Sequence, residues 1–441
     1  MTTTKNNEHK KLNFSSEREQ SQACLNSAEH EKNQGRKVLN VPNLRFPEFQ
    51  GEWEEERLAD IADLYKGTGI SKDQLSDDGE PCILYGELYT KYKSETIREV
   101  ISKTNIDNTK LVRSKANDVI IPCSGETAED IATARCVLNG NILLGGDLNI
   151  IRLHGYDGAF MSYQLNGRRK YDIAKVAQGV SVVHLYGEHL KGVKTINPCL
   201  EEQKKIAKLL SLLDERIATQ NKIIDKLQSL IKGLEDNLLD NPLWEKTYLR
   251  SFMQFFPTNS LSWEQLSYKE GAIRNLHYGL IHSFQTRGIN SASLPMIKNE
   301  AVPKQYILCQ VGDVAFADAS EDTGEIAKSV EFVNTIEGDT ICGLHTIHGR
   351  DIKNRTVVGF KGFAFNSRYF HNQIKRLAQG TKVFSITANN LSSCYVYLPD
   401  LETQKAIVNL LKTYEAKLLV SKRLLEHYEK QKQYLLRQMF I

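Results

Sequence analysis

The stretch NPCLEEQKKIAKLLSLLDERIATQNKIIDKLQSLIKGLEDNLL, residues 197–239, decides the fold that we expect. Its apolar residues recur at alternating spacings of four and three, broken once at Gln220, as at the a and d positions of a coiled coil. About forty residues at ~1.5 Å each give a helix of roughly 60 Å. A single helix cannot bury such a seam, so a partner is required. The seam residues that we expect to pack are Ile206, Leu210, Leu213, Ile217, Ile224 and Leu227.

The chain supplies a second stretch of this kind, LPDLETQKAIVNLLKTYEAKLLVSKRLLEHYEKQKQYLLRQMF, residues 398–440. The motif Pro-x-Leu-Glu-x-Gln opens both stretches, at Pro198 and Pro399, and eight identities recur at an offset of 201. Two unrelated surface helices of similar composition would not share proline and glutamine at one offset. We therefore infer a duplicated domain with its helix. The second set of packing residues is Ile407, Leu411, Tyr414, Leu418, Leu425 and Tyr428.

The regions between the helices also repeat in outline. Tyr85-Gly86 is echoed by Tyr278-Gly279, and the Ala-Gln-Gly triplet at Ala177 by the one at Ala378. Short β-type runs separated by Gly, Asp and Asn predict mixed α+β domains, with a short helix over 58–64 and another over about 163–176. The expected organisation is a disordered polar tail (1–40), domain 1 (41–197), helix 1 (198–241), domain 2 (242–398) and helix 2 (399–441).

Composition excludes several classes of protein. The net charge is +3, hydrophobic residues make up 41% and charged residues 25%, as in an ordinary globular protein. No run of eighteen apolar residues predicts a membrane span, and we expect a cytoplasmic protein. The eight cysteines include no C-x-x-C pair, so their spacing indicates neither a zinc site nor a disulfide framework.

The chain carries none of the catalytic motifs that we sought. It has no phosphate-binding loop, no H-E-x-x-H and no G-x-S-x-G. The nearest strings to the [N/D]-P-P-[Y/F] turn of DNA amino-methyltransferases begin at Asn197 and Asn241, and both lack the second proline. His345 and His348 would share a metal ion only on a helix, and the flanking glycines favour strand and turn. We expect no catalytic residue and no metal ligand.

Polar, basic and aromatic residues in the Gly-rich turns are candidates for contacts with DNA. For each of them a solvated turn or a solvated helix face is an alternative interpretation. In domain 1 the candidates are Lys66, Thr68, Ser71, Lys72, Tyr85, Ser124, Thr127, Arg168, Arg169, Lys170, Gln178 and Ser181. In domain 2 they are Tyr278, Ser320, Gln379, Thr381 and Lys382.

The leader at Leu44–Phe49 with Trp53, the Ala-Gln-Gly turns and the duplicated Pro-x-Leu-Glu-x-Gln openings together resemble specificity subunits of type I restriction-modification systems. The resemblance covers about residues 41–441. It implies an α+β fold in which two pseudo-repeated target-recognition domains are separated by two long antiparallel coiled-coil helices. It also implies that each domain reads one half of a bipartite, asymmetric DNA site.

The same resemblance implies the partners and cofactors. Double-stranded DNA, two methyltransferase (modification) subunits and, when present, restriction subunits would join this non-catalytic chain, with the helices setting the gap between half-sites. S-adenosylmethionine, ATP and Mg²⁺ would be used by the partner subunits, and this chain would bind no cofactor. A non-enzymatic coiled-coil scaffold joining two protein-binding domains is the alternative.

Overall fold

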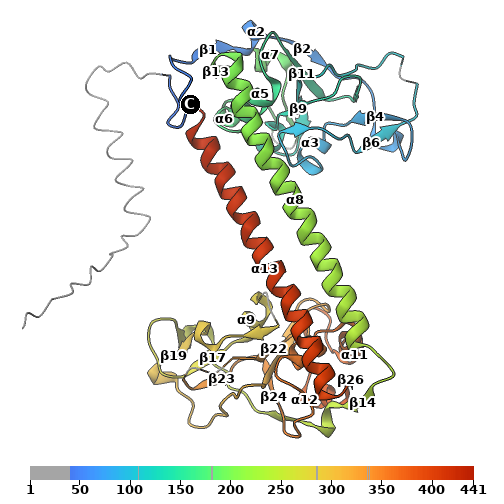
Figure 1. The fold of residues 1–441 in the computed structure, drawn as a ribbon, viewed down its shortest axis with the longest axis vertical. Coiled ribbons are helices and arrows are strands. Elements are labelled where there is room, and N and C mark those ends of the chain that lie inside the picture. The colour runs from blue at the N-terminus through green and yellow to red at the C-terminus, as the bar shows by residue number, and fades with distance from the viewer. Residues whose placement is uncertain (1–39, 108, 180–181, 285–286, 335, 337) are drawn as a thin grey trace, which may run out of the picture. The chain divides into compact units, whose positions relative to one another are not determined.

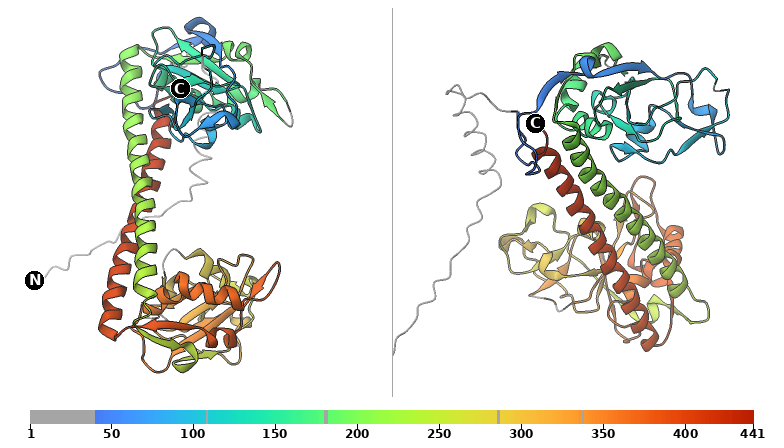
Figure 2. Two further views of the ribbon diagram at one scale, coloured as in Figure 1. Left: turned by 90° about the vertical axis from the view of Figure 1, so that its right-hand side faces the viewer. Right: turned by 45° about the horizontal axis from the view of Figure 1, so that its top comes forward.

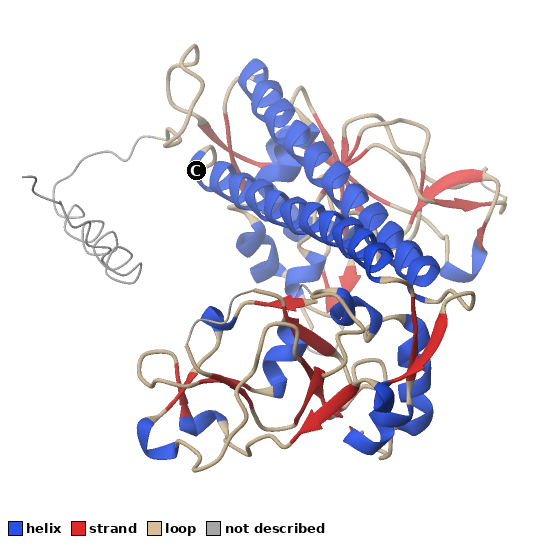
Figure 3. Cartoon of the chain, turned by 60° about the horizontal axis from the view of Figure 1, so that its bottom comes forward, coloured by secondary structure: helices blue, strands red, loops and turns tan. Residues whose placement is uncertain are grey.

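The computed structural model describes residues 40–441 except 108, 180, 181, 285, 286, 335 and 337. The predicted tail therefore lies, except for residue 40, outside the described residues. Two compact units divide the chain. Unit 1 comprises residues up to 212 together with 432–441, and unit 2 comprises residues 213–431. Each unit combines short strands and short helices with part of the two longest helices (Figure 3).

Domain 1, the globular part of unit 1, is built on a five-stranded sheet of order β2-β11-β7-β9-β5. These strands are β2 (Ala62–Lys66), β11 (Leu148–Leu153), β7 (Asp118–Pro122), β9 (Arg135–Val137) and β5 (Thr96–Ile97). All five residues of β7 are buried, as expected for a central strand covered on both faces. A second sheet, of order β10-β4-β6-β3, contains β10 (Leu143–Leu144), β4 (Glu80–Ile83), β6 (Ser102–Thr104) and β3 (Leu75–Ser76).

Domain 2, the globular part of unit 2, repeats this topology strand for strand. Its five-stranded sheet has the order β15-β24-β20-β22-β18 and its four-stranded sheet the order β16-β19-β17-β23. The members are β15 (Met253–Phe256), β24 (Thr346–Asp351), β20 (Val314–Ala317), β22 (Ser329–Phe332), β18 (Gly288–Ile289), β16 (Leu266–Ser267), β19 (Met296–Ile297), β17 (Arg274–Leu276) and β23 (Thr340–Cys342). The mixed, duplicated fold class expected from the sequence is confirmed.

Two local expectations were wrong in detail. The amphipathic run 58–64 is helical only in α2 (Leu58–Ile61), and the chain then continues as β2, because pairing with β11 outweighs the local helical pattern. The helix expected over 163–176 is two helices, α5 (Gly158–Asn166) and α6 (Lys170–Val176), interrupted at Gly167. Glycine favours such a break because it disfavours the helix interior.

The long helices are α8 (Leu200–Leu239) and α13 (Leu401–Gln438), shown in green and red in Figure 1. Within unit 1 the first turns of α8 share a core with the last turns of α13, through Ile206 and Leu210 of α8, Leu435 of α13 and Met439, which directly follows α13. The two helices are therefore antiparallel there. All the seam residues expected to pack are buried or partly buried.

Inside unit 2 the helix pair contains one polar contact in its seam. The Gln220 side chain is 6% exposed, and its Nε2 donates a hydrogen bond of 3.1 Å to the carbonyl oxygen of Ser421. These two residues are 201 positions apart, which is the offset of the sequence repeat. Equivalent residues of the two helices thus meet at this point, so a local pseudo-two-fold axis of the helix pair passes between them. A single buried polar pair of this kind fixes the register of paired helices.

The Pro-x-Leu-Glu-x-Gln motif attaches each long helix to its own domain. Gln203 is 1% exposed, its Nε2 donates to the Pro198 carbonyl at 2.8 Å, and its Oε1 accepts from the Asp157 backbone at 2.9 Å. Gln404 makes the equivalent bonds to Pro399 and Val357, both at 3.0 Å. The duplicated glutamine is therefore a buried connector.

Candidate nucleic-acid interface

The Ala-Gln-Gly triplet of domain 1 opens a turn closed by two backbone hydrogen bonds. Gln178 N–H donates to His184 O at 2.9 Å, and His184 N–H donates to Gln178 O at 2.7 Å. Gly179 has φ +124°, and a Cβ there would lie 2.1 Å from the Val182 carbonyl oxygen, so only glycine fits. The turn leaves the Gln178 side chain exposed at its base.

Domain 2 contains the same turn. Gln379 and Ser385 exchange backbone bonds of 3.0 and 2.8 Å, and Gly380 has φ +130°. Thr381 and Lys382 lie fully within this turn and are exposed. The two turns thus expose polar side chains, Gln178 in the first and Thr381 and Lys382 in the second, which suits close approach to a base edge or a phosphate.

A cleft of about 740 Å³ in domain 1, beside β3 and β4 of the four-stranded sheet, is lined by three of the candidates, Ser71, Lys72 and Tyr85. Ser71 begins a short 3₁₀ helix, where its side chain and that of Gln74 form a capping box. The cap holds the exposed Lys72 at the mouth of the cleft. An ammonium group in this position can neutralise a phosphate.

The wall of this cleft contains the carboxylate of Glu87, which is only 5% exposed. It accepts bonds from the Leu84 backbone at 3.1 Å, from Lys91 Nζ at 2.6 Å and from the Ser102 hydroxyl. The negative charge of Glu87 is therefore compensated inside the fold. An anionic ligand would not meet an uncompensated carboxylate there.

The cleft continues to the glycine turn through Asp147. This residue has φ 58°, and its carboxylate accepts from Ser124 Oγ at 3.3 Å. Ser124 in turn pairs with His184, which closes the turn. Burial raises the pKa of Cys123 to about 11, and the positive charge of Lys66 opposes this rise. Lys66 therefore lies close to Cys123, the residue before Ser124. Six candidates, the three of the cleft together with Lys66, Ser124 and Gln178, therefore share one side of domain 1.

In domain 2 the corresponding face is aromatic. Ser262 and Gln265 form the same capping box, and Trp263 occupies the position of Lys72. Trp263 is 45% exposed, and its ring centroid lies 4.5 Å from that of His277. His277 lies 4.8 Å from the ring of Tyr278. His277 is only 3% exposed, so Trp263 supplies the exposed ring, and such a ring can stack on a nucleic-acid base.

This aromatic face reaches the second glycine turn through His345. Its ring lies 5.3 Å from that of Tyr278, and its Nδ1 lies 3.0 Å from an oxygen of Asp318. Ser320 pairs with Phe384 inside the turn that Gln379 begins. Burial, and secondarily His345, lower the pKa of His277, so this ring is neutral at pH 7. The face offers stacking surfaces and hydrogen-bonding rings rather than fixed positive charge.

The match to known families settles the nature of these domains. The family described as "Type I restriction modification DNA specificity domain" matches residues 50–229 and 293–429. The chain belongs to this family. Its domains therefore serve DNA sequence specificity in type I restriction-modification systems, and the scaffold alternative is not favoured.

Two curated relatives and one solved structure agree with this assignment. The chain is 26% identical over 88% of its length, and 91% of the relative, to the Type I restriction enzyme MjaVIII specificity subunit of Methanocaldococcus jannaschii. It is 24% identical over 90% of its length, and 94% of the relative, to the putative MjaX specificity subunit of the same organism. The S subunit structure from M. genitalium has a TM-score of 0.58 at 16% identity and covers 91% of this chain and 99% of that chain, which supports the fold.

Several other candidates of this specificity-family chain lie elsewhere or have structural contacts. Arg168 donates to the Arg437 carbonyl of α13 at 3.0 Å, and Arg169 pairs with Asp172 at 3.5 Å. Thr127 caps α4 (Ala128–Ile131). Thr68 Oγ1 accepts from the Val112 backbone at 3.2 Å. Lys170 begins α6, and Ser181 lies outside the described residues.

Sequence reasoning missed the residues that give the second face its character. Trp263, His277 and His345 come from three separated segments, and none lies in a motif. The repeat could have revealed two of them, because Trp263 follows a Ser-x-x-Gln box like that of Lys72, and His345 precedes β24 as Asp147 precedes β11. His345 is 49% exposed whereas His348 is 1% exposed, so the two histidines do not form one site.

Proposed function

We propose that each domain reads one half of a bipartite, asymmetric DNA site with the face described above. The supporting observation is a shared backbone frame that carries different side chains. Lys72 of domain 1 is matched by Trp263 of domain 2, and Asp147 by His345. Two frames that place different chemistry at equivalent points suit two different base sequences.

We further propose that the paired helices fix the gap between the half-sites. The seam of α8 and α13 packs side chains rather than leaving a flexible linker, and the Gln220–Ser421 contact sets its register. Two readers on a rigid spacer contact DNA a fixed distance apart.

We also propose that the helix pair binds two copies of one partner. Ile223 of α8 and Leu424 of α13 are 41% and 39% exposed, and each lies three positions after the Gln220 or Ser421 of the pseudo-two-fold contact. Equivalent exposed apolar positions suit identical docking surfaces for two methyltransferase subunits. Restriction subunits would join this assembly when they are present.

The chain itself would act without catalysis, in the cytoplasm. Its sequence contains none of the catalytic motifs sought, and its family assignment is to DNA specificity. In this proposal S-adenosylmethionine, ATP and Mg²⁺ are bound by the partner subunits and not by this chain. None of the helices in the described part of the chain has the length and apolar content that a membrane crossing requires.

Exchanging one domain tests the proposal of independent half-sites. Residues 243–397 are replaced by the matching segment of a relative, and the methylated motif is mapped genome-wide in cells that supply the methyltransferase subunits. We expect one half of the motif to change and the other half to stay. A motif in which both halves change, or neither does, contradicts the proposal.

Lengthening one helix tests whether the helices set the gap between the half-sites. Four helix-forming residues inserted between Gln228 and Ser229 add ~6 Å and rotate the helix about 40° beyond one turn, so the seam is locally preserved. We expect unchanged half-sites and a gap longer by one or two base pairs, since ~6 Å corresponds to at most about two base pairs at ~3.4 Å each. One base pair is favoured over two, because the second helix is not lengthened. Recovery of the original gap at full activity would mean that the helices do not set it.

A further inference from the structure

The interior of domain 2 contains a cluster of soft metal ligands. Cys309 Sγ and Cys342 Sγ lie 3.6 Å apart, and these sulfurs and one ring nitrogen of His348 all lie within 4.8 Å of one another. All three side chains are buried. The residues are far apart in sequence, which is why cysteine spacing did not indicate a site.

The repeat shows that the fold does not require these three residues. The backbone N–H of Gln310 donates to the Asp313 carboxylate, and that of Lys115 donates to the Asp118 carboxylate, so Cys309 corresponds to Ser114 of domain 1. Cys342 and Leu144 both precede the glycine that bonds back to the neighbouring strand. His348 and Ile150 are both the third residue of their strands. Domain 1 thus has Ser, Leu and Ile where domain 2 has Cys, Cys and His.

The geometry suits a tetrahedral ion better than a disulfide bond. Two Zn–S bonds of about 2.3 Å at a tetrahedral angle place the sulfurs about 3.8 Å apart. A disulfide requires about 2.05 Å. The observed separation of 3.6 Å is close to the first value.

The surroundings of His348 complete a typical zinc environment. Its Nε2 lies 2.7 Å from Asp313 Oδ2, and donation of the Nε2 proton to this carboxylate leaves the lone pair on Nδ1. Zinc-bound histidines are commonly oriented by such a carboxylate. Arg350 pairs with the same Asp313 through two bonds of 2.8 Å. The charges then balance, because two thiolates neutralise Zn²⁺ and Arg350 neutralises Asp313.

We propose that Cys309, Cys342 and His348 bind one Zn²⁺ ion in the interior of domain 2. A cavity of about 320 Å³ borders Cys342 and His348 and gives a water molecule access to the fourth coordination position. The ion would cross-link β23, β24 and the segment before β20, and so stabilise one recognition domain and not the other.

Metal analysis of the purified full-length chain tests this proposal. We expect about one zinc per chain by mass spectrometry, and a sulfur-to-cobalt charge-transfer band after replacement by Co²⁺. The variants Cys309→Ser, Cys342→Leu and His348→Ile carry the residues of domain 1, so the core should tolerate them while zinc is lost. Cys394→Ala, a buried cysteine of the same domain outside the cluster, should retain the metal.

Three outcomes would overturn the proposal. They are a native chain without zinc and without the cobalt band, zinc retained at full stoichiometry in Cys342→Leu, and a Cys309–Cys342 disulfide in the native protein. The cobalt band is measured on the unaltered chain, so the test does not depend on the folding of any variant.

Discussion

The two domains attach to the long helices at the same point of their fold but with opposite charges. In unit 1 the residue before the edge strand β5 is Glu95, whose carboxylate lies 2.6 Å from Lys432 Nζ of α13. In unit 2 the equivalent residue before β18 is Arg287, which lies 3.5 Å from Glu235 of α8. The equivalence rests on the backbone, since Cys136 N–H donates to Glu95 O and Glu331 N–H to Arg287 O.

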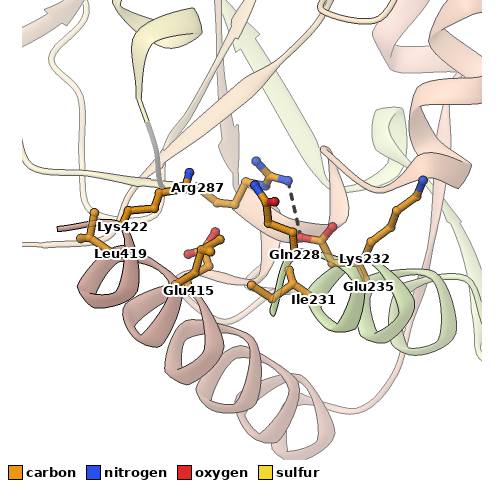
Figure 4. Close-up of a pocket in the computed structure, with 9 residues that line it drawn as sticks. Gln228, Ile231, Lys232, Glu235, Arg287, Glu415, Leu419 and Lys422 are labelled. Atoms are coloured by element: carbon orange, nitrogen blue, oxygen red, sulfur yellow. Dashed lines mark ion pairs between the residues drawn. The ribbon is translucent and has the colours of Figure 1, made fainter. Parts of the chain in front are cut away.

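The unit 2 attachment places two carboxyl groups beside Arg287, in a cavity that Lys232 and Lys422 also line. Figure 4 shows Glu235 and Glu415 on the two helices, both near the Arg287 guanidinium. Both line a cavity of about 300 Å³ with Arg287. Burial raises the pKa of both carboxyl groups, that of Glu415 to about 7. A domain bearing glutamate instead of arginine here would meet two buried acids, so charge discriminates between the two attachments.

Both domains are attached to their long helix by a buried glutamine. Substitution of this glutamine should have the largest effect on stability. Gln404→Leu leaves three partly buried backbone groups, Pro399 O, Arg355 O and Val357 N, without their partner. We expect a loss of about 3 kcal/mol in the free energy of unfolding, and about 2 kcal/mol for Gln203→Leu, which leaves two such groups. Denaturant unfolding measures both.

An exposed glutamine of α13, Gln433, provides the control for this pair. Gln433→Leu should change the free energy of unfolding by less than about 0.5 kcal/mol. Equal small effects in all three variants would show that the motif does not hold the domains.

The burial of Glu415 predicts a pH dependence of stability. Because folding raises the pKa of Glu415 to about 7, stability is greatest below the ordinary carboxyl value of about 4.3 and falls as pH rises towards 7. Glu415→Gln removes the ionisation and keeps an acceptor for the Arg287 backbone. We expect the variant to be more stable than the native chain by on the order of 2 kcal/mol at pH 8, with little difference at pH 4.

Thermal unfolding at several pH values checks this expectation. Glu429→Gln on the exposed surface of α13 serves as the control, and its difference from the native chain should not vary with pH. A Glu415→Gln variant that is less stable at pH 8 would mean that the ionised carboxylate is favourable in its pairing with Arg287.

Features with a local cause in the sequence were predicted, whereas features that depend on pairing between distant segments were not. The heptad seam was predicted because the spacing of Ile206, Leu210 and their successors alone fixes which helix face packs. The glycine turns were marked by the repeat, and the physical requirement is the close carbonyl in front of Gly179. In contrast, the first three residues of β2 were expected to be helical. The pairing of this strand with β11, more than eighty residues away, leaves no local signal in the sequence.

The candidate faces were less predictable for the same reason. Lys72 and Tyr85 attracted attention through their loops, but their common cleft exists only because two sheets bring the loops together. Trp263 and His345 lie in no motif, and Glu95 and Arg287 are single charged residues in unremarkable segments. Their roles depend on pairing between distant segments, which one sequence does not specify. The contacts of the DNA-binding candidates remain predictions.

The ion pair of unit 1 predicts a rescue experiment. Lys432→Glu places a second carboxylate against Glu95 where both side chains are largely buried, at 15% and 11% exposure. We expect a loss of roughly 1–2 kcal/mol, between the values for exposed and fully buried pairs. The double variant Glu95→Lys, Lys432→Glu should recover at least half of that loss in denaturant unfolding. Additive effects of the two changes would show that the charges do not interact.

The smallest expected effect separates the two reading faces. In the assembled complex with its methyltransferase subunits, Lys72→Ala should remove one phosphate contact, and Trp263→Ala one stacking contact. Loss of a phosphate contact reduces the slope of log K against log salt by about 1 and weakens binding to all sequences alike. Loss of a stacked ring weakens binding by about 1 kcal/mol or more without changing that slope.

Affinity for the methylated motif, measured from low to physiological salt, distinguishes the two. Lys204→Ala on the exposed side of α8 is the matched control, and its slope should equal that of the native complex. If Trp263→Ala lowered the slope and Lys72→Ala did not, the assignment of charge to the first face and stacking to the second would be wrong.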